Sequence, residues 1–176
     1  PLGTMAHRLS GPDRYATATT ISRYTYQPGV AAVFAVSGAN FPDGLSAGPA
    51  AAALGAPIVL VPAAGAVPAG VMAELRRLRP QHIYITGSTG AVSAGVATTL
   101  SGVAPVSRLA GSDRYGTAGT IATTIFHTVL GRASLPVVYV ASGALFPDAL
   151  TAGPAAARQG GALLLVPPTG ALPATI

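Results

Sequence analysis

The sequence contains no cysteine, lysine or tryptophan, and only five of its 176 residues are acidic. Without cysteine there is no disulfide framework, no thiolate metal site and no cysteine nucleophile. All ten basic residues are arginines, and the resulting formal net charge of +5 fits an anionic partner. Their only cluster, at residues 76–79, is typical of a solvated helix end rather than of the dense basic patch that binds duplex DNA. We therefore expect no nucleic-acid partner.

A charge-free apolar run covers residues 44–73 and raises the question of a membrane span. Prolines interrupt this run at positions 49, 57, 62 and 68. A lipid-spanning helix of about 20 residues could not satisfy its backbone hydrogen bonds with breakers this frequent. The run therefore predicts a helix, a buried strand and a turn of an α/β domain, and no membrane span.

The chain contains an internal repeat. Residues 8–21 (RLSGPDRYATATTI) match residues 108–121 (RLAGSDRYGTAGTI) at ten of fourteen positions. Residues 37–62 (SGANFPDGLSAGPAAAALGAPIVLVP) match residues 142–167 (SGALFPDALTAGPAAARQGGALLLVP) at seventeen of 26 positions. Two such blocks in the same order indicate a duplicated structural unit.

The repeat divides the chain into three parts. Residues 1–5 (PLGTM) are interpreted as the remnant of a cleaved tag. Residues 6–105 form a complete repeat, and residues 106–176 form a second repeat that is truncated in its C-terminal part, without an equivalent of residues 72–105. A half-built unit leaves a sheet edge and apolar faces exposed unless another element covers them.

Short apolar runs without alternation predict strands buried on both faces, at residues 31–36, 57–61 and 82–86. Helical patterns lie before and between them, at residues 12–24, 42–54, 68–79 and 92–100. Strands that alternate with helices of this length predict right-handed crossovers. The expected fold is α/β with three layers, in which helices flank a mainly parallel sheet and the whole module is repeated in tandem.

Four of the five acids occupy matched positions, Asp13 and Asp113 in DRY and Asp43 and Asp148 in FPD. One interpretation makes them metal ligands or acid/base groups. The other makes them helix caps that also pair with Arg14 or Arg114. We favour the structural interpretation, because no histidine, glutamate or second aspartate lies at ligand spacing around them, and we expect no metal.

The matched arginines are candidates for anion binding, because guanidinium is well shaped for bidentate contact with carboxylate or phosphate. They are Arg8, Arg14, Arg108 and Arg114. Strand ends that meet helix starts form the usual ligand crevice of open α/β sheets. Pairing of Arg14 with Asp43 is the structural alternative.

Backbone amides after the central strand could also hold an anion, at Ser37-Gly38 and Ser142-Gly143. A tight strand-to-helix turn explains these residues equally well and is the interpretation that we favour, and the loop at residues 86–90 has the same ambiguity. The chain lacks P-loop, GxGxxG and GxSxG patterns, which disfavours a hydrolase or a nucleotide-binding enzyme. Tyr15 and Tyr115 repeat and are expected to pack on the core, whereas the three histidines are unrelated by the repeat and carry no shared chemistry.

The ordered motifs RLxGxDRYxTA, a strand ending in SG, FPDxLxAGPxAA and a strand ending in VP resemble the cell wall binding repeat 2 family. The segment HIYITGSTGAVSAGV (82–96) is similar to the third segment of that family, with Gly87-Ser88 where a glycine pair is usual. The resemblance covers nearly all of residues 7–176.

This resemblance implies a Toprim-like α/β module that occurs in tandem, often in threes, in secreted cell-wall proteins of Gram-positive bacteria. Such modules anchor attached enzymes or adhesins noncovalently to an anionic cell-wall glycopolymer, and three of them can associate around a pseudo-threefold axis. The catalytic acids of Toprim enzymes have no counterpart here, so we expect no catalytic residue and no cofactor. The alternative is a protein–protein assembly module, whose partner is a neighbouring repeat or a second copy of the chain.

Overall fold

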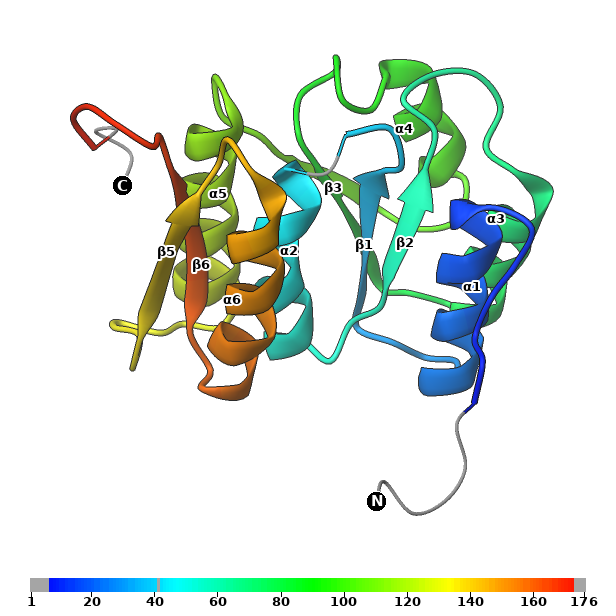
Figure 1. Cartoon of the computed structure of the whole chain (residues 1–176). Coiled ribbons are helices and arrows are strands. Elements are labelled where there is room, and N and C mark those ends of the chain that lie inside the picture. The colour runs from blue at the N-terminus through cyan, green and yellow to red at the C-terminus, as the bar shows by residue number, and fades with distance from the viewer. Residues whose placement is uncertain (1–6, 41, 173–176) are drawn as a thin grey trace.

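The computed structural model describes residues 7–40 and 42–172 (Figure 1). Residues 1–5, interpreted above as a tag remnant, lie outside the described residues. Within the described part, helices and strands alternate along the chain and build two modules that lie side by side.

Four parallel strands form the larger sheet, in the order β2-β1-β3-β4. Their bounds are β1 Ala32–Ser37, β2 Ile58–Val61, β3 His82–Thr86 and β4 Val106–Leu109. Strand β1 is buried along its whole length, since it has a strand on each side and helices on both faces. Strand β4 carries the start of the second sequence repeat, yet it pairs with β3 of the first, with Val106 opposite Ile83.

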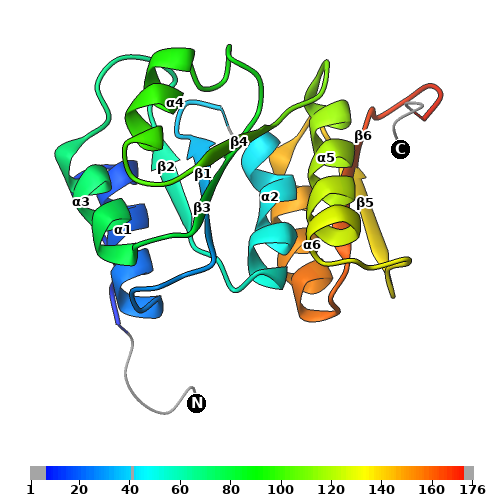
Figure 2. The same ribbon diagram turned by 180° about the vertical axis from the view of Figure 1, so that it is seen from behind.

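Helices cover both faces of the larger sheet (Figures 1 and 2). On the face that carries Val33 and Ala35 lie α1 Arg14–Thr25, α3 Ala69–Leu78 and α4 Ala94–Ser101. On the face that carries Phe34 lies α2 Pro42–Ala53, whose buried alanines Ala47, Ala50 and Ala51 let the helix approach the strands closely. The first module therefore has three layers.

The second module contains a smaller parallel sheet made of β5 and β6. Its elements are α5 Arg114–Ala122, the π-helical η1 Thr123–Val129, β5 Val138–Ser142, α6 Phe146–Arg158 and β6 Ala162–Val166. Within the described residues only one face of this sheet is covered by helices. Val138 and Val140 are 44% and 57% exposed on the other face, whereas their repeat equivalents Val33 and Ala35 are 0% exposed.

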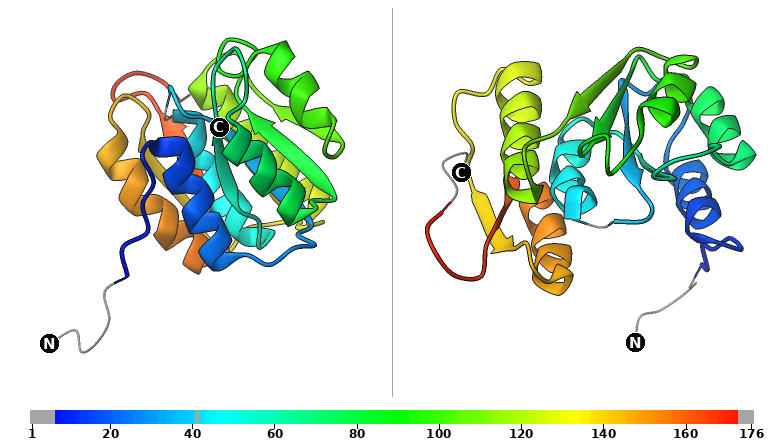
Figure 3. Two further views of the ribbon diagram at one scale, coloured as in Figure 1. Left: turned by 90° about the vertical axis from the view of Figure 1, so that its right-hand side faces the viewer. Right: turned by 90° about the horizontal axis from the view of Figure 1, so that it is seen from above.

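Helix α2 joins the two modules. It packs on its own sheet and also against α5, α6 and β6 of the second module, as the view from above shows (Figure 3, right). Leu45 of α2 packs against the cluster that contains Leu163 and Leu165 of β6. The groove that β6 forms with α5 and α6 is thus filled by a helix of the preceding module.

The structure confirms the predicted α/β fold with a parallel sheet flanked by helices. Each of the seven helices and strands expected from the sequence lies within two residues of its expected bounds. Similarity to the Toprim fold stays a prediction. The short strand β4 and the π-helical turn η1 were not expected from the sequence, because the four residues of β4 include a serine and an arginine and form no apolar run.

Candidate functional site

The DRY motif starts a helix in both repeats. Asp13 precedes α1 in an extended conformation, and its side chain accepts a hydrogen bond of 2.7 Å from the amide of Ala16. Asp113 accepts the equivalent bond of 2.8 Å from Gly116. These bonds satisfy amides that a helix N-terminus leaves without a partner, which is the reason aspartate is favoured at this position.

The tyrosine and the arginine of DRY hold the turn that follows the central strand. A Cβ at Gly38 would lie 2.6 Å from Cε1 of Tyr15, so the ring can lie against the turn only because residue 38 is glycine. Arg14 Nη1 donates to the carbonyl oxygen of Gly38. In the second repeat, Arg114 Nη1 donates to the carbonyl of Gly143 over 2.6 Å, and this glycine lies against Tyr115 in the same way.

The serine of each turn bonds locally. Ser37 is buried, and its Oγ accepts a hydrogen bond of 3.2 Å from the amide of Ala39. Ser142 accepts the same bond from Ala144. This geometry fits a tight strand-to-helix turn, the alternative to an anion-binding nest.

A hollow of about 490 Å³ lies at the carboxyl ends of β1 and β2, and we call it the SG groove. Arg14, Ser37 and Gly38 line it together with the first turn of α2 and Leu60 of β2. The guanidinium of Arg14 is exposed, and no aspartate or glutamate is among the residues that line this groove. The sequence-predicted residues Arg14, Ser37 and Gly38 are therefore brought together at one strand end.

A second hollow of about 370 Å³ lies between the modules, and we call it the junction cleft. It is polar, and Asn40 lines both this cleft and the SG groove, so the two hollows adjoin. Besides glycines and Pro42, the residues that line it are Asn40, Asp43, Ser88, Ala91, Ser112, Asp113, Arg114 and Thr117. Arg114 of the second module thus faces α2 of the first.

Asp43 lies near Arg114 and does not form an ion pair with Arg14. Within the described residues the ion pairs involve Glu74 and not Asp43, and the charge that acts on Asp43 is that of Arg114 across the junction. Burial raises the pKa of Asp43, and the attraction of Arg114 offsets only part of this effect. Its repeat equivalent Asp148 is exposed. The pairing of Asp43 with Arg14, considered above as the structural alternative, is therefore not formed. Arg114, the other partner considered there, is the arginine whose charge acts on Asp43, because α2 points its first turn at the second module.

Arg108 and Arg8 have unequal surroundings. Arg108 donates to the carbonyls of Gly87, Ser88 and Val92 at 2.8–3.0 Å, and burial lowers its pKa. These three hydrogen bonds therefore hold the loop that lines the junction cleft, and a ligand contact of Arg108 stays a prediction. Arg8 is exposed, and no ion pair of the described residues involves it.

Several lining residues were not singled out from the sequence. They are Asn40, Ser112 and Thr117, whereas Ser88 belongs to the loop at residues 86–90 that was considered above. Asn40 is a leucine, Leu145, in the second repeat, although the residues on both sides of it match. This replacement of an apolar residue by a polar one could have indicated a site at Asn40. Ser112 and Thr117 line the cleft only because the modules pack through α2, which no local pattern indicates.

The matched modules, each with an arginine held beside a glycine turn at its strand ends, define a tandem-repeat binding protein. The profile of the cell wall binding domain 2 (CWB2) family matches residues 8–97 and 108–176, and the chain belongs to this family. The resemblance seen in the sequence is thereby confirmed, as is the predicted cell-wall location of a secreted protein.

Relatives of known identity match nearly the whole chain. The N-acetylmuramoyl-L-alanine amidase LytC of Bacillus subtilis (strain 168) is 31% identical over 96% of this chain and 32% of its own length. The amidase enhancer of the same organism is 30% identical over 90% of this chain and 21% of its own length. The chain therefore spans about a third or less of these curated relatives.

Two solved structures of Clostridium difficile proteins share the fold. Cwp8 superposes with a TM-score of 0.84 at 29% identity, over 95% of this chain and 28% of that one. Cwp6 superposes with a TM-score of 0.81 at 30% identity, over 90% of this chain and 24% of that one. Among residues 7–40 and 42–172, no helix has the length and apolar character needed to cross a membrane. The same residues contain no group of three or more metal-ligating side chains.

Proposed function

We propose that this chain is a noncatalytic module that attaches its parent protein to an anionic polysaccharide of the Gram-positive cell wall. The observation that supports this function is the SG groove, where the exposed side chain of Arg14 lines a hollow with no aspartate or glutamate among its lining residues. One N–H of Arg14 is used by Gly38, which fixes the side chain and leaves its other donors for a ligand.

The chemistry of a repeating polyanion suits this arrangement. Arg14 and Arg114 occupy equivalent places in the two modules, so a polymer can contact both, with the adjoining hollows between them. Each contact is weak alone, and affinity arises because the second contact is intramolecular once the first has formed. Exposed contacts of this kind weaken as salt screens them.

Binding to purified Gram-positive cell walls tests the proposal. We expect the chain to sediment with the walls, to be released along a salt series, and to stop binding once the anionic polymer has been removed. Binding that persists without the polymer, or that does not change with salt, would contradict an electrostatic attachment.

The variant Arg14→Gln is expected to bind walls about tenfold more weakly, because a hydrogen bond to a charged group is lost. Arg158→Gln is the matched control, since it removes the same charge from an exposed position at the end of α6. The measurement is the free concentration at half-saturation of the walls, with thermal unfolding as a check of folding. Equal losses in both variants would mean that only net charge matters.

A second function, assembly with further modules of the same kind, is favoured by a separate observation. The first module has an open apolar groove of about 390 Å³, lined by Ile21 of α1, Gly48 of α2 and Leu60 of β2. The equivalent groove of the second module is filled by α2, which buries Leu163 and Leu165 to 1% and 0% exposure.

The helix surface that would fill such a groove is also exposed, on α6 of the second module. Leu45 of α2 packs into the second module, whereas its equivalent Leu150 on α6 is 57% exposed. The first module therefore has an open apolar groove, and the second module has an exposed helix surface of the kind that fills the equivalent groove. A helix of the FPDxLxAGPxAA type from another module matches the groove.

Self-association of the chain, measured by light scattering against concentration, is expected to be abolished by Ile21→Asp and by Leu150→Asp, because each charge would be buried without a partner. In a mixture of the two variants, Leu150→Asp still has an intact groove and Ile21→Asp still has an intact helix surface. The mixture should therefore form dimers that do not associate further. A chain that stays monomeric at all concentrations would exclude a second copy as the occupant.

A further inference from the structure

The two arginine-lined hollows differ in charge. The SG groove contains Arg14 and no aspartate or glutamate among its lining residues. The junction cleft contains Arg114 together with the carboxyl groups of Asp43 and Asp113. Two positions that are equivalent in sequence therefore offer an anion very different surroundings.

Asp43 is placed in the junction cleft by three features of the fold. It lies in the first turn of α2, the helix that points into the second module. Its carboxylate lies directly against the backbone of residue 87, since a Cβ there would be 2.2 Å from Oδ2. The loop that contains Gly87 is held in turn by Arg108 through two carbonyls at 2.8 and 3.0 Å.

We propose that Asp43 is a pH-dependent competitor for Arg114, so that the junction cleft admits an anionic group of the polymer only when Asp43 is protonated, whereas the SG groove admits one at any pH. This inference rests on the proposed function, because it concerns the same polymer and the same pair of arginines. It assigns to Asp43 the regulation of one of two matched contacts.

The physical basis is the balance of charge around Arg114. With Asp43 and Asp113 ionised, the cleft holds more negative than positive charge, and an entering phosphate or carboxylate is repelled. Protonation of Asp43 removes one carboxylate beside the guanidinium. Burial raises the pKa of Asp43 above that of an exposed aspartate, so acidification neutralises it earlier.

The other side chains around the cleft are either uncharged or held by hydrogen bonds of their own. Asn40 precedes α2, Ser88 comes from the loop after β3, and Ser112 comes from the loop after β4; none of these side chains titrates in this range. Asp113 is held as the cap of α5 by the amide of Gly116. Arg108 lies behind the loop with its donors on backbone carbonyls, and no histidine is among the residues that line the cleft.

The test measures binding of poly(glycerol phosphate), because a phosphodiester keeps its charge while the protein titrates. At fixed ionic strength, we expect the wild-type chain to bind about three- to tenfold more tightly at about pH 4.5 than at about pH 8. The Asp43→Asn variant should bind at about pH 8 as tightly as the wild type does in acid, and should lose most of this pH dependence.

Asp148→Asn is the matched control. It makes the same chemical change at the repeat-equivalent position, which is exposed, and it leaves all three histidines in place. We expect it to keep the wild-type pH profile. An Asp43→Asn profile that superposes on that of the wild type would overturn the proposal, and so would equal profiles for the two asparagine variants.

A readout without polymer separates this inference from the proposed function. The carboxyl carbon of Asp43, followed by NMR, should titrate at higher pH in Arg114→Gln than in the wild type, because the attraction that lowers its pKa is removed. A titration that Arg114→Gln leaves unmoved contradicts the competition. If this shift is seen but no variant binds polymer at any pH, the proposed function fails while the Asp43–Arg114 coupling stands.

Discussion

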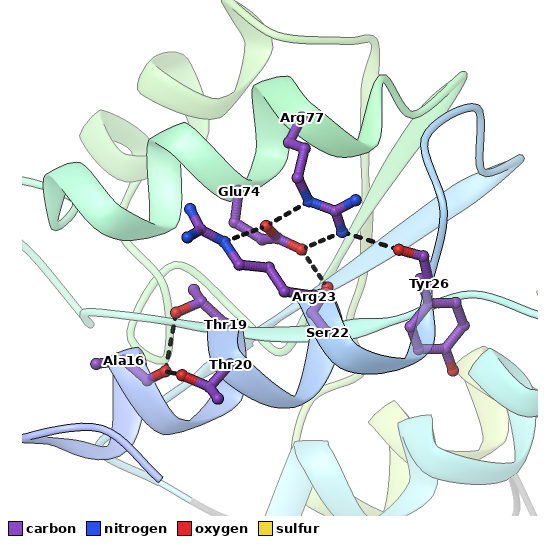
Figure 4. Close-up of polar contacts among 8 residues, drawn as sticks. All are labelled: Ala16, Thr19, Thr20, Ser22, Arg23, Tyr26, Glu74 and Arg77. Carbon is purple, nitrogen blue, oxygen red and sulfur yellow. Dashed lines mark hydrogen bonds and ion pairs between the residues drawn. The ribbon is translucent and has the colours of Figure 1, made fainter. Parts of the chain in front are cut away.

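Replacing Glu74 with glutamine is expected to lower the free energy of unfolding by about 2–4 kcal/mol, the largest loss that we predict for a single polar substitution in this chain. Glu74 is 0% exposed on α3, where its carboxylate faces α1 (Figure 4). It accepts hydrogen bonds from Ser22 Oγ at 2.6 Å, from Arg23 Nε at 3.0 Å, and from Arg77 at 2.7 and 2.8 Å. A glutamine side chain has one accepting oxygen where the carboxylate has two, so some of these donors, which include the buried Ser22, lose their partner.

The network ties two helices and a chain turn together. Arg77 also donates to the carbonyl of Tyr26 over 3.0 Å, so the end of α1 is held by the same guanidinium (Figure 4). The guanidinium of Arg23 is more than half exposed and can turn to water, which keeps the expected loss below that of a fully buried pair. Asp148→Asn, the same change at an exposed position, should alter the free energy of unfolding by less than about 0.5 kcal/mol in chemical denaturation.

The stability that Glu74 contributes depends on pH. Burial by itself would raise the pKa of this carboxyl, but hydrogen bonds from Arg77, Ser22 and Arg23 outweigh burial and hold the pKa below its ordinary value. A lowered folded-state pKa means that the contribution is complete above the pKa of the unfolded chain, about 4.3, and is lost as pH falls toward the folded-state value. The difference in unfolding free energy between wild type and Glu74→Gln should therefore shrink in acid. A difference that stays constant down to about pH 3 would refute this linkage.

Most of the first module could be predicted from local sequence patterns. Apolar runs without alternation located three buried strands, and proline and glycine marked the helix boundaries, because each of these signals acts within a few residues. The DRY and SG motifs could be interpreted for a similar reason. The aspartate cap, the tyrosine packing and the arginine hydrogen bond of each motif lie within one module.

The junction between modules could not be predicted in this way. Asp43 and Asp148 stand in identical FPD motifs, yet one is half-buried beside Arg114 and the other is exposed. The difference comes from which element packs on each helix start, and that depends on the insertion of α2 into the second module. Glu74 lies outside the repeated motifs, so the sequence comparison that singled out the other four acids passed over the one that carries the ion pairs of the described residues.

The second large effect is expected at Gly87, where alanine should lower the free energy of unfolding by about 2–4 kcal/mol. Two costs add there. Gly87 has a φ of +92°, a conformation that disfavours any side chain, and its Cβ would lie 2.2 Å from Oδ2 of Asp43 and 2.8 Å from Cβ of Ala91. The glycine therefore makes room for the carboxylate in the junction cleft.

Gly65→Ala separates the two costs. Gly65 has a similar φ of +83°, but a Cβ there would meet nothing within 4 Å, so only backbone strain of about 1 kcal/mol is expected. In an Asp43→Ala background, Gly87→Ala should become less costly by at least about 1 kcal/mol, because the closest contact is gone, whereas the cost of Gly65→Ala should not change. Additive effects of Gly87→Ala and Asp43→Ala in chemical denaturation would mean that the carboxylate does not lie against this loop, and the placement of Asp43 beside Arg114 would lose its main support.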